Sequence, residues 1–118
     1  MRFWIVKNAW WMRWADGMVI GPWVWLRFRK VRKNPMTEYQ RREGEQNVAW
    51  NQRIYRHELE HVYQIVKVGR LKFYWRYLAD AVKNSYRKIP AEVEAYAHQN
   101  EPLTPKEVKW LADGKIKV

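Results

Sequence analysis

The segment from Tyr55 to Gln64 holds the side chains whose types and spacing are best suited to chemistry. His57, Glu58 and His61 form a His-Glu-x-x-His pattern, in which two imidazoles can bind one zinc ion and the adjacent carboxylate can move a proton. On a helix with about 100° per residue, the two histidines lie about 40° apart and one turn apart. The spacing therefore predicts two metal ligands on one helix face, with a glutamate beside them.

The helical wheel also indicates which face of this helix is buried. The apolar residues that share a side with the two histidines are Trp50, Ile54 and Ile65. Glu58 lies at the margin of this stripe, whereas Glu60 points away from it. We therefore expect both histidines and Glu58 to face inward and Glu60 to be solvated.

A third ligand must be a histidine or a carboxylate, because the chain has no cysteine. A catalytic zinc ion normally has three protein ligands and one open position. Glu92 and Glu94 are about 200° apart on a helix, so only one of them can face the ion. Glu92 lies at the edge of that helix's apolar stripe, whereas Glu94 falls on the polar side with His98 and Glu101. This favours Glu92 over Glu94 as the third ligand.

Length and charge limit the class of protein. With 118 residues, the chain can form one domain with a modest core, and an apolar content of 47% excludes a disordered chain. The net charge of +11 suits anionic partners such as nucleic acid, membrane surfaces or acidic proteins. The basic residues at 27–33 and 41–42 accompany no nucleic-acid motif, so nucleic acid is not the favoured partner.

The apolar runs near the start of the chain are too short for a signal peptide or a membrane span. Lys7 ends the first run, and Arg13 and Asp16 interrupt the next one. We therefore expect a cytoplasmic protein. The sequence does not indicate its oligomeric state.

Short apolar runs in the first thirty residues predict a small antiparallel sheet with one face on a core. These runs cover residues 3–6, 10–14, 18–20 and 23–29. Asp16-Gly17 predicts a hairpin turn between the second and third runs. In the fourth run, Val24 and Leu26 alternate with outward residues, and its arginines are typical of an edge strand.

Helical spacing dominates the remainder of the chain. We predict a loop over residues 34–47, with a short helical turn after Thr37, and then a helix over 48–67 that ends at Gly69. A helix over residues 71–86 follows, another from Pro90 to residue 100, and a last one from Thr104 to residue 112 before a basic tail. The residues of the second helix that we assign to the core are Leu71, Tyr74, Trp75, Leu78, Ala81 and Val82. The expected fold is a single α+β domain over residues 1–118, with a sheet part at 1–33 and a helical part that carries the metal site at 48–112.

These motifs resemble those of the gluzincin metallopeptidases, the thermolysin-like clan. A closer likeness is to small minigluzincin-like zinc peptidases encoded by bacteria and phages, which carry HExxHvxQ, a later glycine with an aromatic-rich helix, and P-x-E-x-E-A-Y. The matching segments here are residues 57–64, Gly69, residues 73–77 and residues 90–96. The glycine-bounded segment 17–21 is also similar to a strand of that family.

The resemblance implies a single-lobe, zincin-like fold and zinc-dependent hydrolysis of a protein or peptide substrate. One zinc ion would be held by His57, His61 and Glu92, with Glu58 as general base. An extended substrate would lie along the edge strand predicted at 23–29. The candidates for stabilising the oxyanion, or for supporting a ligand, are Tyr63, Tyr86, Tyr96 and His98. Tyr96 stands where larger gluzincins have an aspartate that supports a zinc histidine.

Two other functions agree with the same sequence. Zinc could staple a small fold without catalysis, although a structural site does not need Glu58. A basic protein with nine tryptophans could instead bind nucleic acid or a membrane surface. A domain of this size has a shallow cleft, which predicts weak, selective or latent activity. Residues 103–118 either cover that cleft or, as we favour, pack on the core as a plain terminal helix.

Overall fold

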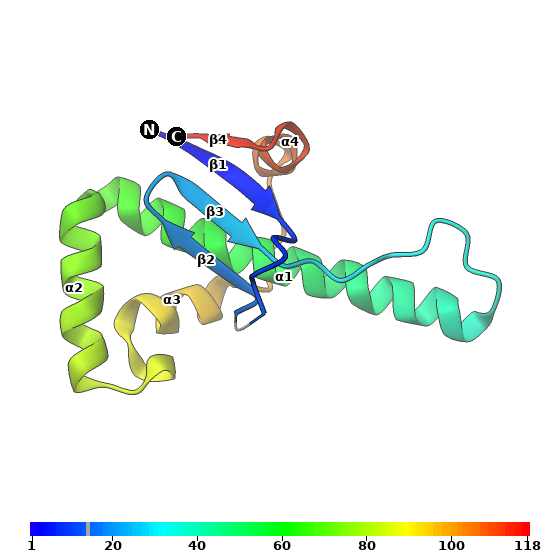
Figure 1. Cartoon of the computed structure of the whole chain (residues 1–118), viewed down its shortest axis with the longest axis horizontal. Helices are drawn as coiled ribbons and strands as arrows, with labels where there is room; N and C mark the ends of the chain where they lie inside the picture. Colours follow the sequence, from blue (N-terminus) through cyan, green and yellow to red (C-terminus); the bar gives the residue numbers. More distant parts are fainter. Residues whose placement is uncertain (14) are drawn as a thin grey trace.

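The computed structural model describes residues 1–13 and 15–118 and confirms the α+β class. A four-stranded sheet lies against one long helix, and three shorter helices pack around the C-terminal half of that helix (Figure 1). No helix among the described residues is long and apolar enough to cross a membrane. The elements are β1 (Arg2–Lys7), β2 (Gly17–Ile20), β3 (Trp23–Leu26), α1 (Glu38–Val68), α2 (Arg70–Lys83), the 3₁₀ helix η1 (Tyr86–Lys88), α3 (Pro90–His98), α4 (Pro105–Asp113) and β4 (Lys115–Lys117).

The sheet is mixed, so the prediction that it is antiparallel is wrong for one pair of strands. Its order is β2-β3-β1-β4, in which β1 and β3 are parallel and the other pairs are antiparallel. The chain reverses between β1 and β2 and again between β2 and β3, so β3 enters beside β1 in the same direction. The strand predicted over residues 10–13 is a turn in that first reversal, and Trp14 lies outside the described residues.

The hairpin turn lies at Gly21-Pro22 rather than at the predicted Asp16-Gly17. Ile20 and Trp23 pair directly across it, which leaves two residues to make the turn. Gly21 has a φ of +57°, which lies in the left-handed region that glycine adopts at little cost. The turn therefore forms at this glycine.

β3 lies inside the sheet, so the prediction of an edge strand over residues 23–29 is wrong. β3 ends at Leu26, and the two edges of the sheet are β2 and β4. The predicted alternation is confirmed, because Val24 and Leu26 are fully buried while Trp23 is exposed. The predicted basic tail forms β4, because Ile116 is buried in the core while the lysines on either side face outward.

Helix α1 begins at Glu38, so the loop predicted over residues 34–47 is too long. The Thr37 side chain accepts a hydrogen bond from the N–H of Gln40 and caps the helix. Arg41 forms ion pairs with Glu38 and Glu45, and such pairs stabilise an exposed helix by about 0.3 kcal/mol each. Local interactions thus hold the first turns of α1, which extend away from the body of the protein (Figure 1).

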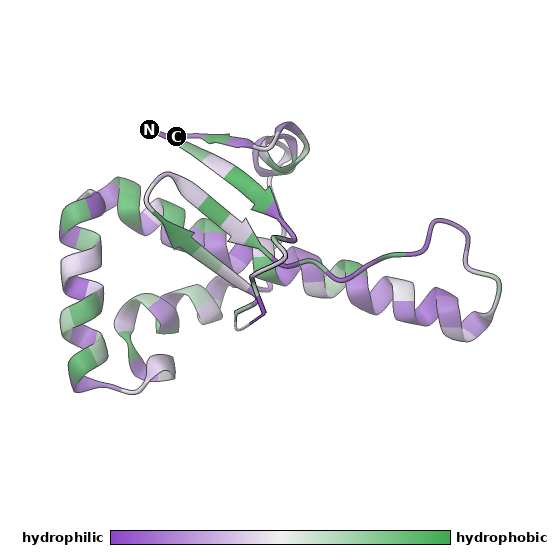
Figure 2. Ribbon diagram, viewed as in Figure 1, coloured by the Kyte–Doolittle hydropathy of each residue, from purple (hydrophilic) through white to green (hydrophobic). Residues whose placement is uncertain are grey.

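Gly69 ends α1 as predicted, but α2 exposes most of the face that was assigned to the core. Phe73 is buried, and Tyr74 and Tyr77 pack partly buried against the core. Two sets of apolar residues in α2 have helical spacing. The set that packs inward comprises Phe73, Tyr74 and Tyr77. Hydrophobic residues recur along α2 (Figure 2). The members of the other set are exposed, and they are Leu71, Trp75, Leu78 and Val82.

A buried polar network joins α4 to α1. Arg56 donates hydrogen bonds to Glu60 and to Glu107 of α4 (2.6 Å), and the Tyr63 hydroxyl also donates to Glu107 (2.6 Å). Glu60 is buried, so the prediction that it is solvated is wrong. The cause is Arg56, one turn earlier, which neutralises Glu60 and is itself held by α4. Trp110 is buried too, so α4 packs on the core as we favoured.

Candidate metal centre

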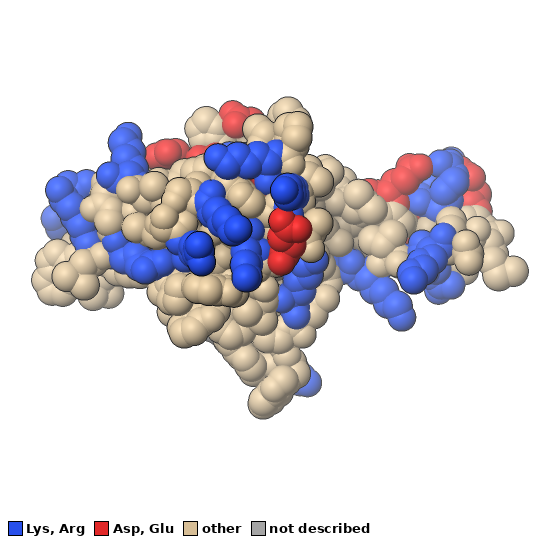
Figure 3. Space-filling view, turned by 90° about the horizontal axis from the view of Figure 1, so that it is seen from above, with Lys and Arg blue, Asp and Glu red and all other residues tan. Residues whose placement is uncertain are grey.

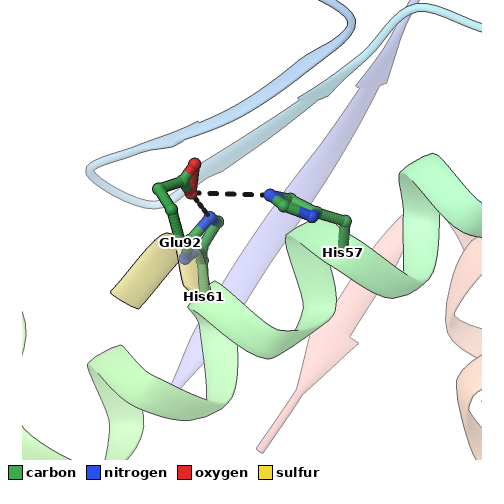
Figure 4. A group of neighbouring side chains, drawn as sticks. All are labelled: His57, His61 and Glu92. Atoms are coloured by element: carbon green, nitrogen blue, oxygen red, sulfur yellow. Dashed lines mark ion pairs between the residues drawn. The ribbon is translucent and has the colours of Figure 1, made fainter. Parts of the chain in front are cut away.

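Three buried side chains from α1 and α3 converge on one point. His57 and His61 lie one turn apart on α1, and Glu92 is on the first turn of α3. Oε1 of Glu92 is 3.4 Å from Nε2 of His57 and also contacts Nε2 of His61. One potential ligand atom from each residue lies within 4.8 Å of the other two (Figure 4). The three residues are close enough to hold one metal ion.

Helix α3 brings Glu92, and not Glu94, to the histidines. Pro90 occupies the first turn of α3, where its fixed φ suits the start of a helix, and Ile89 before it is buried. The side-chain amide of Gln64 on α1 donates to the carbonyl of Ala91 (3.1 Å) and ties this first turn to α1. Glu92 is 1% exposed, whereas Glu94 is exposed to solvent.

Gln64 also orients one of the histidines. Its Oε1 lies 3.0 Å from Nδ1 of His61, three residues earlier on the same helix. When His61 Nδ1–H donates to this oxygen, Nε2 keeps its lone pair toward Glu92, which is the tautomer that a metal ligand needs. The sequence motif includes Gln64, but we did not predict this role. The sequence feature that indicates this role is the spacing of three residues between His61 and Gln64.

The charges in this cluster depend on one another. Burial raises the pKa of Glu92, but hydrogen bonds from His57 and His61 outweigh it and hold that pKa well below its ordinary value. Burial also disfavours the charged form of His61, yet its hydrogen bond to Glu92 and the nearby Glu58 raise its pKa to about 9. The charged forms of Glu92 and His61 thus stabilise each other.

The chemistry of these groups fits a divalent metal ion. Two imidazole nitrogens and one carboxylate are a common set of ligands for zinc. Oε2 of Glu92 and Oε2 of Glu58 are both buried without a hydrogen-bond partner among the described residues. Buried carboxylate oxygens are costly to leave unpaired, and a bound cation would satisfy them.

Glu58 lies beside the three converging residues but is not one of them. It is 5% exposed, and burial raises its pKa to about 7, against the opposing effect of the two histidines. Strand β2 passes directly over it, because a Cβ atom at Gly17 would lie 2.8 Å from Cγ of Glu58. Only glycine permits this approach, and the sequence alone did not indicate it.

The cluster opens into a cavity of about 850 Å³ between β2, α1, α2 and α3. Its walls include the converging residues, Glu58 and the first residues of β2. The aromatic residues that line it are Trp50, Phe73, Tyr74, Tyr77, Tyr86 and Tyr96. This wall makes the cavity suitable for a partly apolar ligand.

Two of the four predicted auxiliary residues reach this cavity. The Tyr96 ring packs edge-on against His57, with ring centroids 4.7 Å apart. Tyr86 lines the cavity together with Glu92, and burial and this neighbouring carboxylate raise the pKa of Tyr86. The described lining does not include Tyr63, which bonds to Glu107, or His98, which pairs with Glu101 (2.6 Å) near the surface.

Comparisons of the chain with protein-family models, with curated proteins and with solved structures gave no match. The case for a function therefore rests on the chain's own residues and their geometry.

Proposed function

We propose that the protein is a zinc-dependent peptidase of the gluzincin type. The observation that carries the proposal is the convergence of buried His57, His61 and Glu92 beside the buried carboxylate of Glu58, in one cavity. Two imidazoles and a carboxylate leave an open position on a four-coordinate metal ion, as catalysis requires. A structural zinc site would have no use for a buried carboxylate at this place.

The proposed reaction is the hydrolysis of a peptide bond by water. A bound zinc ion would act as a Lewis acid, which makes water more acidic and polarises the scissile carbonyl. Glu58 accepts a proton from the attacking water and delivers it to the leaving amine. Its burial keeps bulk water away from this transfer.

We assign different roles to Tyr96 and Tyr86, two of the four tyrosines in the described lining of the cavity. Tyr96 packs against His57 and lines the cavity, so its hydroxyl is our candidate donor to the oxyanion. Tyr86 lines the cavity together with Glu92, and we assign its hydroxyl the role of holding this carboxylate toward the histidines.

The substrate is proposed to bind as an extended strand along β2. β2 is the sheet edge beside the cavity, and this replaces the earlier proposal for residues 23–29. Because β2 and β3 form a two-residue hairpin, Gly17 and Val19 direct their backbone groups away from β3. The Val19 carbonyl accepts a hydrogen bond from Tyr74 (3.0 Å), whereas Gly17 lies next to Glu58. A peptide paired with Gly17 would have its scissile bond beside the general base.

Native mass spectrometry of the zinc content tests the metal site. We expect one zinc ion in the wild type and little or none in His61→Ala and Glu92→Ala. Glu94→Ala is the matched control, because it removes an exposed carboxylate two residues from Glu92, and it should keep the ion. A folded wild type that binds no zinc would refute the proposal.

Glu58→Gln separates catalysis from a purely structural role for zinc. The amide cannot accept the proton, so hydrolysis of a fluorogenic peptide mixture should fall by at least about 100-fold while zinc content stays the same. A zinc-loaded wild type without activity on any peptide would favour the zinc-stapled module instead.

A further inference from the structure

Helix α2 carries an apolar row that the described structure leaves uncovered. Its members are Leu71, Trp75, Leu78 and Val82, which are 89%, 74%, 57% and 82% exposed. At about 100° per residue, these positions fall within an arc of about 60°. Large apolar side chains that are exposed together in this way mark an interaction surface.

The apolar row is a second face of α2, distinct from the face that packs on the protein. Phe73, Tyr74 and Tyr77 point inward and line the cavity. The hydroxyl of Tyr74 also bonds to β2, through the Val19 carbonyl (3.0 Å) and the N–H of Gly21 (2.9 Å). α2 is therefore anchored in its present orientation, and the apolar row cannot turn inward without breaking these contacts.

A basic row runs beside the apolar row. Lys72, Arg76 and Lys83 are exposed and fall within an arc of about 40°, centred about 110° from the apolar row. Asp80, the one acidic residue in the α2 sequence, lies beyond them and is partly buried. Lysine and arginine side chains lie across the face seen in Figure 3, this end of the molecule included. The outer side of α2 thus combines apolar and positively charged residues.

We infer that α2 docks on an anionic bilayer surface. The apolar row would enter the headgroup region, and the basic row would contact lipid phosphates along one side of it. The net charge of +11 attracts the whole protein to such a surface. Trp75, in the middle of the apolar row, is the residue type that favours the boundary between headgroups and acyl chains.

Two other occupants fit the same observations less well. A second copy would bring its own charge of +11 against the first, and the two basic rows would repel each other. A protein partner normally anchors in a pocket. α2 instead lies at one end of the molecule (Figure 1), and a fluid headgroup layer can adapt to the convex surface of a helix with an exposed apolar row.

Flotation with lipid vesicles tests the inference, and it requires neither zinc nor catalysis. Wild type should bind vesicles of phosphatidylcholine that contain about one third phosphatidylserine, bind pure phosphatidylcholine far less, and dissociate as salt is added. Leu71→Ser/Trp75→Ser and Lys72→Glu/Arg76→Glu should each weaken partitioning by about tenfold or more. All four side chains are exposed, so the variants should fold, and circular dichroism checks this.

Matched variants elsewhere serve as controls. Trp10→Ser removes a tryptophan that is 85% exposed outside α2, and Arg32→Glu/Lys33→Glu reverses two exposed charges in the segment before α1. Trp10→Ser should bind as wild type does, and Arg32→Glu/Lys33→Glu, which lowers the net charge as much as Lys72→Glu/Arg76→Glu, should lose much less binding than that variant. The inference is overturned if wild type does not float with anionic vesicles, or if the controls lose as much binding as the α2 variants. It is also overturned if the α2 variants abolish only self-association, or only binding to an acidic peptide.

Discussion

Glu107→Gln should destabilise the protein by removing the centre of the network between α1 and α4. Glu107 is 2% exposed and accepts hydrogen bonds from Arg56 (2.6 Å), Tyr63 (2.6 Å) and the N–H of Thr104 (2.8 Å). An amide has one acceptor oxygen where the carboxylate has two, and it carries no charge. The variant therefore leaves at least one donor of the network unpaired, and Arg56 loses one of its two charged partners while it keeps Glu60.

The expected cost follows from these contacts. Removing one partner of a buried ion pair costs about 3–5 kcal/mol, and because Glu60 remains we expect about 3 kcal/mol here. For a domain of this size, the melting temperature should fall by roughly 12 °C. A domain with ordinary stability of about 5–15 kcal/mol would still fold.

The pH dependence of the protein's stability tests the same substitution in a second way. Burial opposes the charge of Glu107, but its bonds to Thr104, Tyr63 and Arg56 prevail and lower its pKa. A carboxyl whose folded-state pKa is lowered stabilises the protein above its unfolded pKa of about 4.3, and loses this effect as the pH falls through the folded value. The difference in free energy of unfolding between wild type and variant should therefore be largest at neutral pH and become smaller below about pH 4.

Urea unfolding and thermal melting at neutral and acidic pH measure both effects. Glu43→Gln, an exposed glutamate on α1, is the control and should melt as wild type does. If Glu107→Gln melts within a degree or two of wild type, the carboxylate contributes no net stability and the reasoning is refuted.

Three further substitutions test other features. Gly17→Ala places a methyl group 2.8 Å from Glu58, so peptide hydrolysis should fall by about 100-fold without loss of zinc, and full activity would disprove the close approach. In Gly44→Ala, the new Cβ would meet nothing nearer than 4.0 Å, and alanine favours the helix more than glycine does. The free energy of unfolding in urea titrations should therefore rise by up to about 1 kcal/mol, and a lower free energy of unfolding would contradict this. Gln64→Ala removes the support of His61 and should weaken zinc binding by about 10- to 100-fold in chelator competition, whereas unchanged affinity would exclude that role.

The sequence predicted the residues of the candidate site better than their surroundings. The spacing of His57 and His61 depends only on helix geometry, and the choice of Glu92 depended only on the apolar face of α3. Both are local properties that a helical wheel shows. The approach of Gly17 to Glu58 joins segments far apart in the chain, so no local pattern could predict it.

The errors in the fold have the same origin. α2 has two apolar faces, and periodicity alone could not tell that Phe73 rather than Trp75 faces the core. Glu60 lies on the polar side of the wheel, but α4 later supplies Glu107 to hold Arg56 beside it. The order of the strands depends on how β3 inserts between β2 and β1, which is a tertiary choice.

Helix α1 is one continuous element, yet its two halves differ in what holds them. Its buried residues all lie between Tyr55 and Ile65, whereas its first turns rely on caps and exposed ion pairs. Backbone amides in the first turns should therefore exchange with solvent deuterium through local fraying, and those near His57 and His61 only through global unfolding. A protease cut or an inserted segment within residues 38–45 would consequently leave the candidate metal centre intact.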